Sequence, residues 1–204
     1  MAGLDSAIIF DCEYLVVPDA PRRFWCGPYD PDPVVAQIGA VRLALEGDFE
    51  LEATFTSYIN PVDRTGTAYK IDPFFTDLTG ITQATIDQQG VPLSDALAAF
   101  DAFSRGARFW SWGKDELNLM AISTYVAGVP PSIPPTRFGN ACSLLLAADI
   151  PYDTVKSLRS NTIAAHFGIE HDGKAHDALG DAMSVGLVLQ HLLRDGRLPP
   201  SAFA

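Results

Sequence analysis

The hydrophobic pattern near the N-terminus predicts a buried strand that acquires a polar face. The segment Ala7–Tyr14 (AIIFDCEY) begins with apolar residues and then alternates. Phe10 and Cys12 fall on one face of this strand. Asp11 and Glu13 fall on the other, about 7 Å apart along the strand, because residues i and i+2 point to the same side.

Two more strands are predicted directly afterwards. The runs Val34–Leu45 (VVAQIGAVRLAL) and Phe49–Ile59 (FELEATFTSYI) have strand character, and Glu46–Asp48 between them is typical of a hairpin turn. Three sequential strands joined by a short turn predict an antiparallel meander that opens a mixed sheet.

The period changes in the middle of the chain. Apolar residues recur at helical spacing in Leu93–Phe103, and Ala107–Trp112 (ARFWSW) has the pattern of a buried strand. A second helix is predicted over Lys114–Ala127, ending at Gly128. The proline-rich Pro130–Pro135 (PPSIPP) is expected to be a stiff loop.

The last third predicts helices over Ser157–Phe167 and Asp177–Leu193. Asp195–Ala204 has the character of a loose tail. Because the chain shows no internal repeat and no linker, we expect one α/β domain over residues 1–194, with helices covering a mixed sheet, and a tail over 195–204.

Composition supports a soluble, folded protein. The chain has 204 residues, of which 48% are hydrophobic and 19% charged, enough to bury one core. No apolar run approaches the roughly 20 residues that span a bilayer, and Met1–Ser6 lacks the pattern of a secretion signal. The widely spaced Cys12, Cys26 and Cys142 indicate small buried thiols in a reducing compartment. We therefore expect a cytoplasmic protein without membrane contact.

The net charge of −11 opposes broad binding along nucleic acid phosphates. Any contact with nucleic acid should be local. Divalent cations held by some of the carboxylates would reduce the repulsion.

Candidate chemistry lies in the carboxylates. Asp11 and Glu13 repel each other unless they are solvated, protonated or bridged by a metal. Hard oxygen ligands of this kind suit Mg²⁺ or Mn²⁺, although a D-x-E pair alone is also typical of a solvated strand face. Asp115 follows the strand ending at Trp112 and is either functional or a favourable charge at a helix N-terminus. Glu116 beside it competes for the same role.

A histidine and an aspartate form the last candidate, in the segment 175–182 (AHDALGDA). Five residues turn a helix by about 500°, so His176 and Asp181 face one site only if His176 lies on the loop before the helix. Gly173 and Lys174 favour such a loop. Asp177 is expected to be a helix N-cap. The other histidines are expected to have structural roles: His166, His171 and His191.

The ordered set of motifs resembles the DEDDh family of 3′-5′ exonucleases, within the RNase H-like (DnaQ-like) superfamily. The family's three motifs appear as FDCE, WSWGKDELNL and AHDALGDA. Intervening segments are also similar to the family: AQIGAV, LTGIT and SLRSNTIAAHFGI. The resemblance runs from about Ile8 to Leu193.

The resemblance implies an RNase H-like fold whose mixed five-stranded sheet has three antiparallel strands followed by parallel ones. It also implies two divalent metal ions, Mg²⁺ or Mn²⁺, and hydrolysis at the 3′ end of single-stranded RNA or DNA, with release of nucleoside 5′-monophosphates. By position, His176 would be the general base. The metal-binding carboxylates would be Asp11, Glu13, Asp115 and Asp181. Two metals can activate a water and stabilise the leaving oxygen, and a histidine can accept a proton near neutral pH.

Three features bear on the substrate. Tyr14 follows the first motif where the family often has threonine, and it either stacks on a base or packs in the core. Leu78 matches an apolar position that wedges beside the last bases in some relatives. The insertion Val16–Pro33 carries Arg22, Arg23, Phe24, Trp25 and Tyr29 and either grips a single strand or packs over the domain.

Two rival functions stay open. The first is an exonuclease-like module of weak or no activity that binds nucleic acid or a protein, and the second is an RNase H-type endonuclease, which would not need His176. The Ala- and Leu-rich last helix serves either the core or a homodimer interface.

Overall fold

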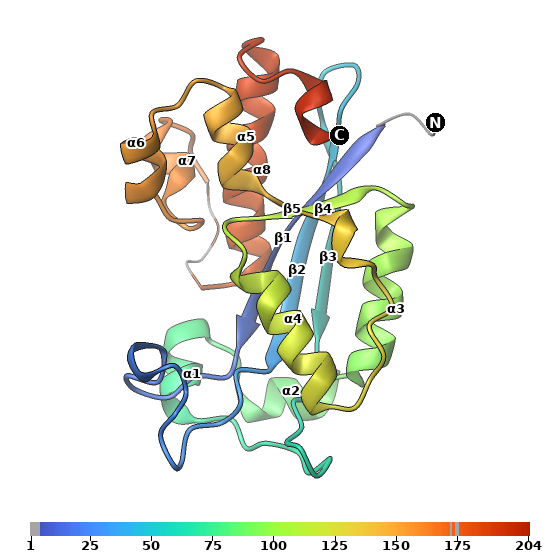
Figure 1. Ribbon diagram of the computed structural model, residues 1–204, viewed down its shortest axis with the longest axis vertical. Coiled ribbons are helices and arrows are strands. Elements are labelled where there is room, and N and C mark those ends of the chain that lie inside the picture. The colour runs from blue at the N-terminus through green and yellow to red at the C-terminus, as the bar shows by residue number, and fades with distance from the viewer. Residues whose placement is uncertain (1–4, 172, 174–175) are drawn as a thin grey trace.

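A five-stranded mixed sheet forms the framework, in the order β3-β2-β1-β4-β5 (Figure 1). The computed structural model describes residues 5–171, 173 and 176–204. The strands are β1 (Ser6–Tyr14), β2 (Val35–Ala44), β3 (Leu51–Tyr58), β4 (Arg108–Ser111) and β5 (Phe138–Asn140). Strands β1, β2 and β3 pair antiparallel, whereas β4 runs parallel to both β1 and β5. The predicted meander and mixed sheet are confirmed.

Eight α-helices and three short 3₁₀ turns are present in the described part of the chain. The helices are α1 (Pro73–Thr79), α2 (Gln83–Gln89), α3 (Leu93–Ser104), α4 (Asp115–Val126), α5 (Ala141–Ala147), α6 (Tyr152–Ser157), α7 (Ile163–His166) and α8 (Ala178–Arg194). The 3₁₀ turns are η1 (Pro21–Arg23), η2 (Pro135–Arg137) and η3 (Pro200–Phe203). The predicted long helices correspond to α3, α4 and α8.

The helix predicted over Ser157–Phe167 is wrong in extent. Helix α6 ends at Ser157, and the chain becomes helical again only in α7. Between them the Arg159 carbonyl accepts hydrogen bonds from the Thr162 and Ile163 N–H groups and closes a turn. Polar residues such as Ser160 and Asn161 favour turns over helix interiors, which explains the break.

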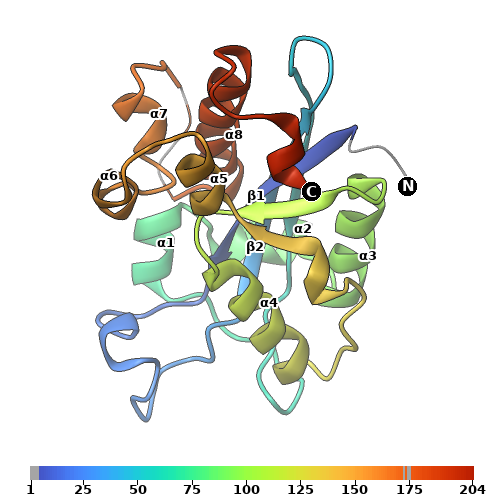
Figure 2. The same ribbon diagram turned by 45° about the horizontal axis from the view of Figure 1, so that its top comes forward.

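Helices cover both faces of the sheet (Figures 1 and 2). On one face, α8 packs together with α5, α7 and η3 against Ala7 and Ile9 of β1. On the other face, α3 and α4 pack against Ile8, Phe10 and Cys12. The alternation predicted for β1 is confirmed, and Asp11 and Glu13 continue the row that faces α8.

The C-terminal segment is not the loose tail predicted for 195–204. Leu198 and Phe203 are almost completely buried. The Phe203 ring lies edge-on to Trp110 of β4, with 5.5 Å between ring centroids. The segment returns to the sheet and completes the core on the α8 face.

Two further expectations concern membrane-spanning helices and the burial of the cysteines. Within the described residues, the helices are all too short or too polar to cross a membrane. Cys12 is buried and Cys142 half-buried, but Cys26 is exposed. The prediction of buried thiols is therefore wrong for Cys26, which lies on an irregular loop rather than on a core element.

Candidate active site

The residues predicted for the site line one cavity of about 390 Å³. Because β1 and β4 run parallel, their carboxyl ends meet at the same edge of the sheet, and α4 starts from that edge. The cavity opens there, between the N-terminal turns of α4 and α8. All seven predicted residues line it: Asp11, Glu13, Tyr14, Leu78, Asp115, His176 and Asp181.

The start of α8 lies close to Asp11 and Glu13 of β1 because residues of the neighbouring strand β2 contact it directly. Gly39 pairs with Asp11 across the sheet, and a Cβ at Gly39 would lie 2.1 Å from the backbone nitrogen of Leu179. Next along the same face, Gln37 accepts a hydrogen bond from the Ala178 N–H at 3.2 Å and donates one to the Asp177 carboxylate at 3.0 Å. These contacts hold the first turn of α8 against β1.

His176 and Asp181 share the site because His176 precedes the helix. Asp177 caps α8 by accepting from the Gly180 N–H at 3.1 Å, which confirms the predicted N-cap. His176 stands just before it in a left-handed conformation, with φ 60°. Ligand atoms of Glu13, His176 and Asp181 lie within 4.8 Å of one another. Of the loop residues considered before this motif, Gly173 is described, whereas Lys174 lies outside the described residues.

Burial and like charge act together on the carboxylates. Asp11 is buried, and burial followed by the nearby Glu116 raises its pKa well above the usual range. Burial and then the charge of Asp181 raise the pKa of Glu13 to about 8. Burial and then the charge of Asp177 raise the pKa of Asp181 to about 6, against a hydrogen bond from the His176 backbone that lowers it. Ionising all of these carboxyl groups at once is therefore unfavourable unless a cation binds among them.

The fourth carboxylate has two candidates in the structure. Asp115 is exposed, and its Oδ1 lies toward Gly113, where a Cβ would be only 2.8 Å away. Glu116 is buried, and its Oε2 has no hydrogen-bond partner among the described residues. Burial and the charge of Asp115 raise the pKa of Glu116 to about 8. Both side chains line the cavity, and the rivalry seen in the sequence persists in the structure.

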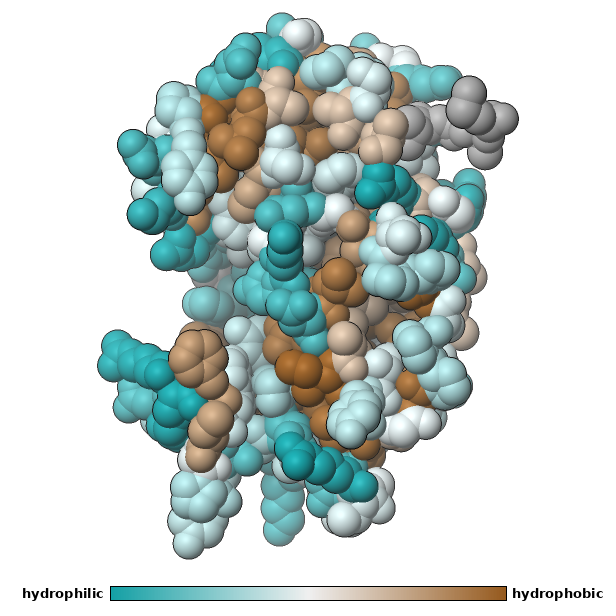
Figure 3. All heavy atoms as spheres, viewed as in Figure 1, coloured by the Kyte–Doolittle hydropathy of each residue, from teal (hydrophilic) through white to brown (hydrophobic). Residues whose placement is uncertain are grey.

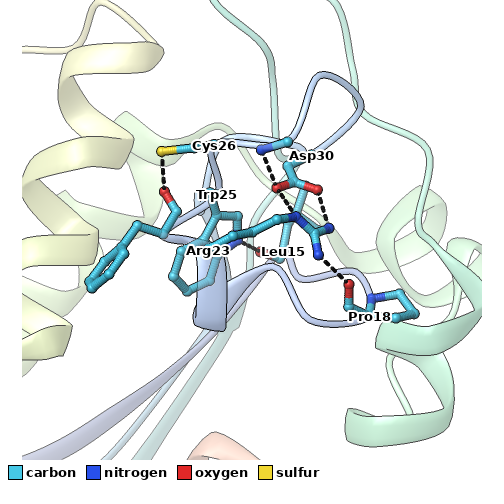
Figure 4. A network of polar contacts seen from close by, with 8 residues as sticks. Leu15, Pro18, Arg23, Trp25, Cys26 and Asp30 are labelled. Atoms are coloured by element: carbon cyan, nitrogen blue, oxygen red, sulfur yellow. Dashed lines mark hydrogen bonds and ion pairs between the residues drawn. The ribbon is translucent and has the colours of Figure 1, made fainter.

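The insertion Val16–Pro33 uses its polar groups mainly on itself (Figure 4). Arg23 binds both Asp30 oxygens, at 2.9 and 2.5 Å, and the Pro18 carbonyl at 3.0 Å. The Trp25 indole donates to the Leu15 carbonyl at 3.1 Å, and its ring packs on Tyr14 with 5.7 Å between centroids. The insertion Val16–Pro33 is therefore held in a defined conformation beside the cavity by its own hydrogen bonds and packing.

Several residues of the site were not predicted from the sequence. Gln37 carries a spacing signal, since Q-x-G on β2 lies opposite D-x-E on β1. Arg159, Ser160 and Asn161 also line the cavity, from the turn between α6 and α7. These three residues fall in the family-like segment SLRSNTIAAHFGI, but that segment is predicted to be a helix and no role is predicted for them.

Comparisons with known proteins agree with this geometry. No protein-family model matches the chain. The 3′-5′ exonuclease Snipper of Drosophila melanogaster is 26% identical over 166 residues, a match that covers 73% of this chain and 57% of that protein. The chain thus spans little more than half the length of this curated relative.

Solved structures share the fold. The nuclease domain of 3′hExo, a DEDDh family member bound to rAMP, matches with a TM-score of 0.75 at 20% identity, covering 95% of this chain and 94% of that chain. Cell-death related nuclease 4 (CRN-4) matches with a TM-score of 0.71 at 17% identity, covering 94% of this chain and 64% of that chain. E. coli ExoI, from its complex with ssDNA, matches with a TM-score of 0.62 at 17% identity, covering 91% of this chain and 40% of that chain. The predicted RNase H-like fold and the resemblance to DEDDh nucleases are confirmed.

Proposed function

We propose that the chain is a 3′-5′ exonuclease that removes nucleoside 5′-monophosphates from the 3′ end of single-stranded RNA or DNA. The observation that carries this proposal is the convergence of Asp11, Glu13, Asp181 and His176 in one open cavity. The curated relative is a 3′-5′ exonuclease, and E. coli ExoI was solved with single-stranded DNA.

The donor set fits divalent metal ions. Buried carboxylates that repel one another are stabilised by a bound cation, and the unpartnered Oε2 of Glu116 points to the same need. Oxygen ligands favour Mg²⁺ or Mn²⁺ over softer metals. When bound, two such ions would polarise a water and stabilise charge on the phosphate and leaving oxygens. We propose Asp11, Glu13 and Asp181, with Asp115 or Glu116, as their ligands.

The remaining groups act on the substrate. We propose that His176 accepts the proton of the attacking water, because it projects from a loop at the cavity and imidazole exchanges protons near neutral pH. Tyr14 and Leu78 line the cavity from β1 and α1 and are proposed to flank the terminal nucleotide. Asp11 and Glu13 are held in place because the rest of their row on β1 is packed in the core.

The test is incubation of the protein with 5′-labelled single-stranded RNA and DNA in Mg²⁺, in Mn²⁺ and in a chelator. A metal-dependent ladder that shortens from the 3′ end is expected, and the better substrate identifies the preferred sugar. Asp11→Ala should abolish the ladder, and His176→Ala should slow it by about 10²-fold or more.

Other outcomes would select a rival function. Internal fragments would indicate an endonuclease. Intact substrate in every metal, with a folded protein, would reject the exonuclease and favour the binding module.

A further inference from the structure

A second hollow adjoins the candidate active site. It is a groove of about 970 Å³ between the insertion Val16–Pro33 and α4. Tyr14 and Asp115 line both this groove and the catalytic cavity, so the two hollows lie side by side. In Figure 3 the insertion projects at the lower left, where Figure 1 places it, and a recess separates it from the rest of the lower half.

The walls of the groove carry exposed aromatic rings. Phe24 on the insertion is 83% exposed, and Tyr125 on α4 is 87% exposed. Both line the groove, together with the partly exposed Ile122. Contiguous apolar side chains that face water along a groove are a feature of interaction sites and ligand-binding grooves.

The insertion buries neighbouring groups but leaves the Phe24 side chain exposed. Phe24 and Trp25 are consecutive left-handed residues, with φ 54° and 51°, and both line the groove. Trp25 is fixed inward by its hydrogen bond to Leu15 and by its packing on Tyr14. The bidentate contact of Arg23 with Asp30 closes the loop behind them (Figure 4).

The groove offers rings rather than free positive charge. Arg64, which lines it, binds both oxygens of Asp32, at 3.1 and 2.6 Å. Asp115 adds a negative group at the inner end. A strand of phosphates gains little here, whereas unpaired bases can stack on Phe24 and Tyr125.

We propose that this groove binds the unpaired bases of a single-stranded nucleic acid upstream of the nucleotide in the catalytic cavity. The inference rests on the proposed function for the direction in which the strand runs. Stacking on Phe24 and Tyr125 is tolerant of sequence because every base has a π-face. A duplex, whose bases are already stacked, is a poor ligand for this groove.

Binding tests the groove without requiring catalysis. A labelled single-stranded oligonucleotide of about ten residues is titrated with the protein in a chelator, and fluorescence anisotropy reports the affinity. Phe24→Ala and Tyr125→Ala should each weaken binding at least about fivefold. The matched controls Tyr29→Ala and Tyr152→Ala remove rings that are 94% and 66% exposed but do not line the groove, and they should leave the affinity unchanged.

Kinetics give a second readout. For the same two groove variants, KM should rise more for the long strand than for a dinucleotide, which is too short to follow the groove. Thermal melting verifies that each variant is folded.

The outcomes separate the groove from the proposed function. Equal affinities of wild type and groove variants, or no binding of the oligonucleotide by wild type, would overturn the groove. Ring-dependent binding without any metal-dependent hydrolysis would support the groove and reject the exonuclease.

Discussion

At the scale of single residues, the carboxylates of the cavity are the source of an energetic conflict. Burial and mutual repulsion raise the pKa of Asp11, Glu13, Asp181 and Glu116, so each ionises less readily in the metal-free fold than in the unfolded chain. Each unit of such a shift amounts to about 1.4 kcal/mol once the group is forced to ionise.

This conflict predicts that the metal-free protein loses stability as pH rises. On folding, the pKa of Glu13 rises from 4.5 to about 8, and the pKa of Asp181 rises from 3.8 to about 6. The folded state therefore binds more protons between these values, and the stability contributed below the unfolded pKa is lost as pH rises through the folded pKa. In a chelator, the melting temperature should be at least about 5 °C higher at pH 5 than at pH 8.

The metal and a variant provide the controls. Mg²⁺ or Mn²⁺ should raise the melting temperature at pH 8 and reduce the difference. Asp181→Asn removes one of the groups and should flatten the dependence in the chelator. A melting temperature that is the same at both pH values would contradict the raised pKa values.

A second residue-scale prediction decides between Asp115 and Glu116. If the exposed Asp115 binds metal, Asp115→Ala should lower kcat/KM by at least about a hundredfold and Glu116→Ala much less. If the buried Glu116 binds metal, the order is reversed. Parallel assays of the two variants, with metal titrated by calorimetry, decide it. Similar small losses in both variants would remove this position from the metal site.

The sequence could predict the residues that follow a local rule. Alternation placed Asp11 and Glu13 on one face, and the N-cap rule separated Asp177 from Asp181. Glu116 could not be ranked, because spacing along the chain does not say which neighbour turns inward. Gln37 acts across the sheet on α8, more than a hundred residues later, and that contact exists only in the fold.

At the scale of elements, the contact of α8 with β2 depends on the absence of a side chain at Gly39. Gly39→Ala would bring a Cβ within 2.3 Å of the backbone of Ala178 and Leu179. The helix must shift, so we predict a loss of about 1–3 kcal/mol in the free energy of unfolding, measured in urea. Activity should fall as well, because the same shift moves Asp181 away from β1.

The control for Gly39 is its partner on β3. Thr56 pairs with Gly39 but is exposed, so Thr56→Ala should change the free energy of unfolding by less than about 0.5 kcal/mol. Equal effects of the two variants would contradict the tight contact.

The elements that the sequence did not predict are the short ones. Helices α1, α2 and α5 have seven residues each, too few to establish a helical period. Each carries a start signal in its N-cap: Asp72, Thr82 and Asn140. The long α3, α4 and α8 were predicted because their periodicity spans three turns or more.

At the scale of the whole molecule, the C-terminal segment closes the core from the far end of the sheet. Phe203→Ala would empty a fully buried site against Trp110, and we predict a cost of about 3–5 kcal/mol in the free energy of unfolding. Chemical denaturation measures it. Ser201→Ala, an exposed change in the same 3₁₀ turn, should have almost no effect. If Phe203→Ala changed the free energy of unfolding as little as Ser201→Ala, the C-terminal segment would be a loose tail, as the sequence predicted.

The overall architecture was predictable because the meander, the helices and the motif order agree with one another. The tail was misjudged because its polar and proline residues have no period. Its burial comes from two side chains that meet β4 and α8 only after the chain has folded.

The paired arginines beside the groove have a consequence for how salt affects binding. Arg23 and Arg64 already neutralise Asp30 and Asp32, so a docking strand finds few free cations there. Counterion release from the strand should therefore be small. We expect the affinity for single strands to fall by less than about tenfold between roughly 50 and 200 mM salt, as for contact with one or two phosphates. Such a protein would remain bound to a single-stranded end at salt concentrations that dissociate proteins relying on phosphate contacts.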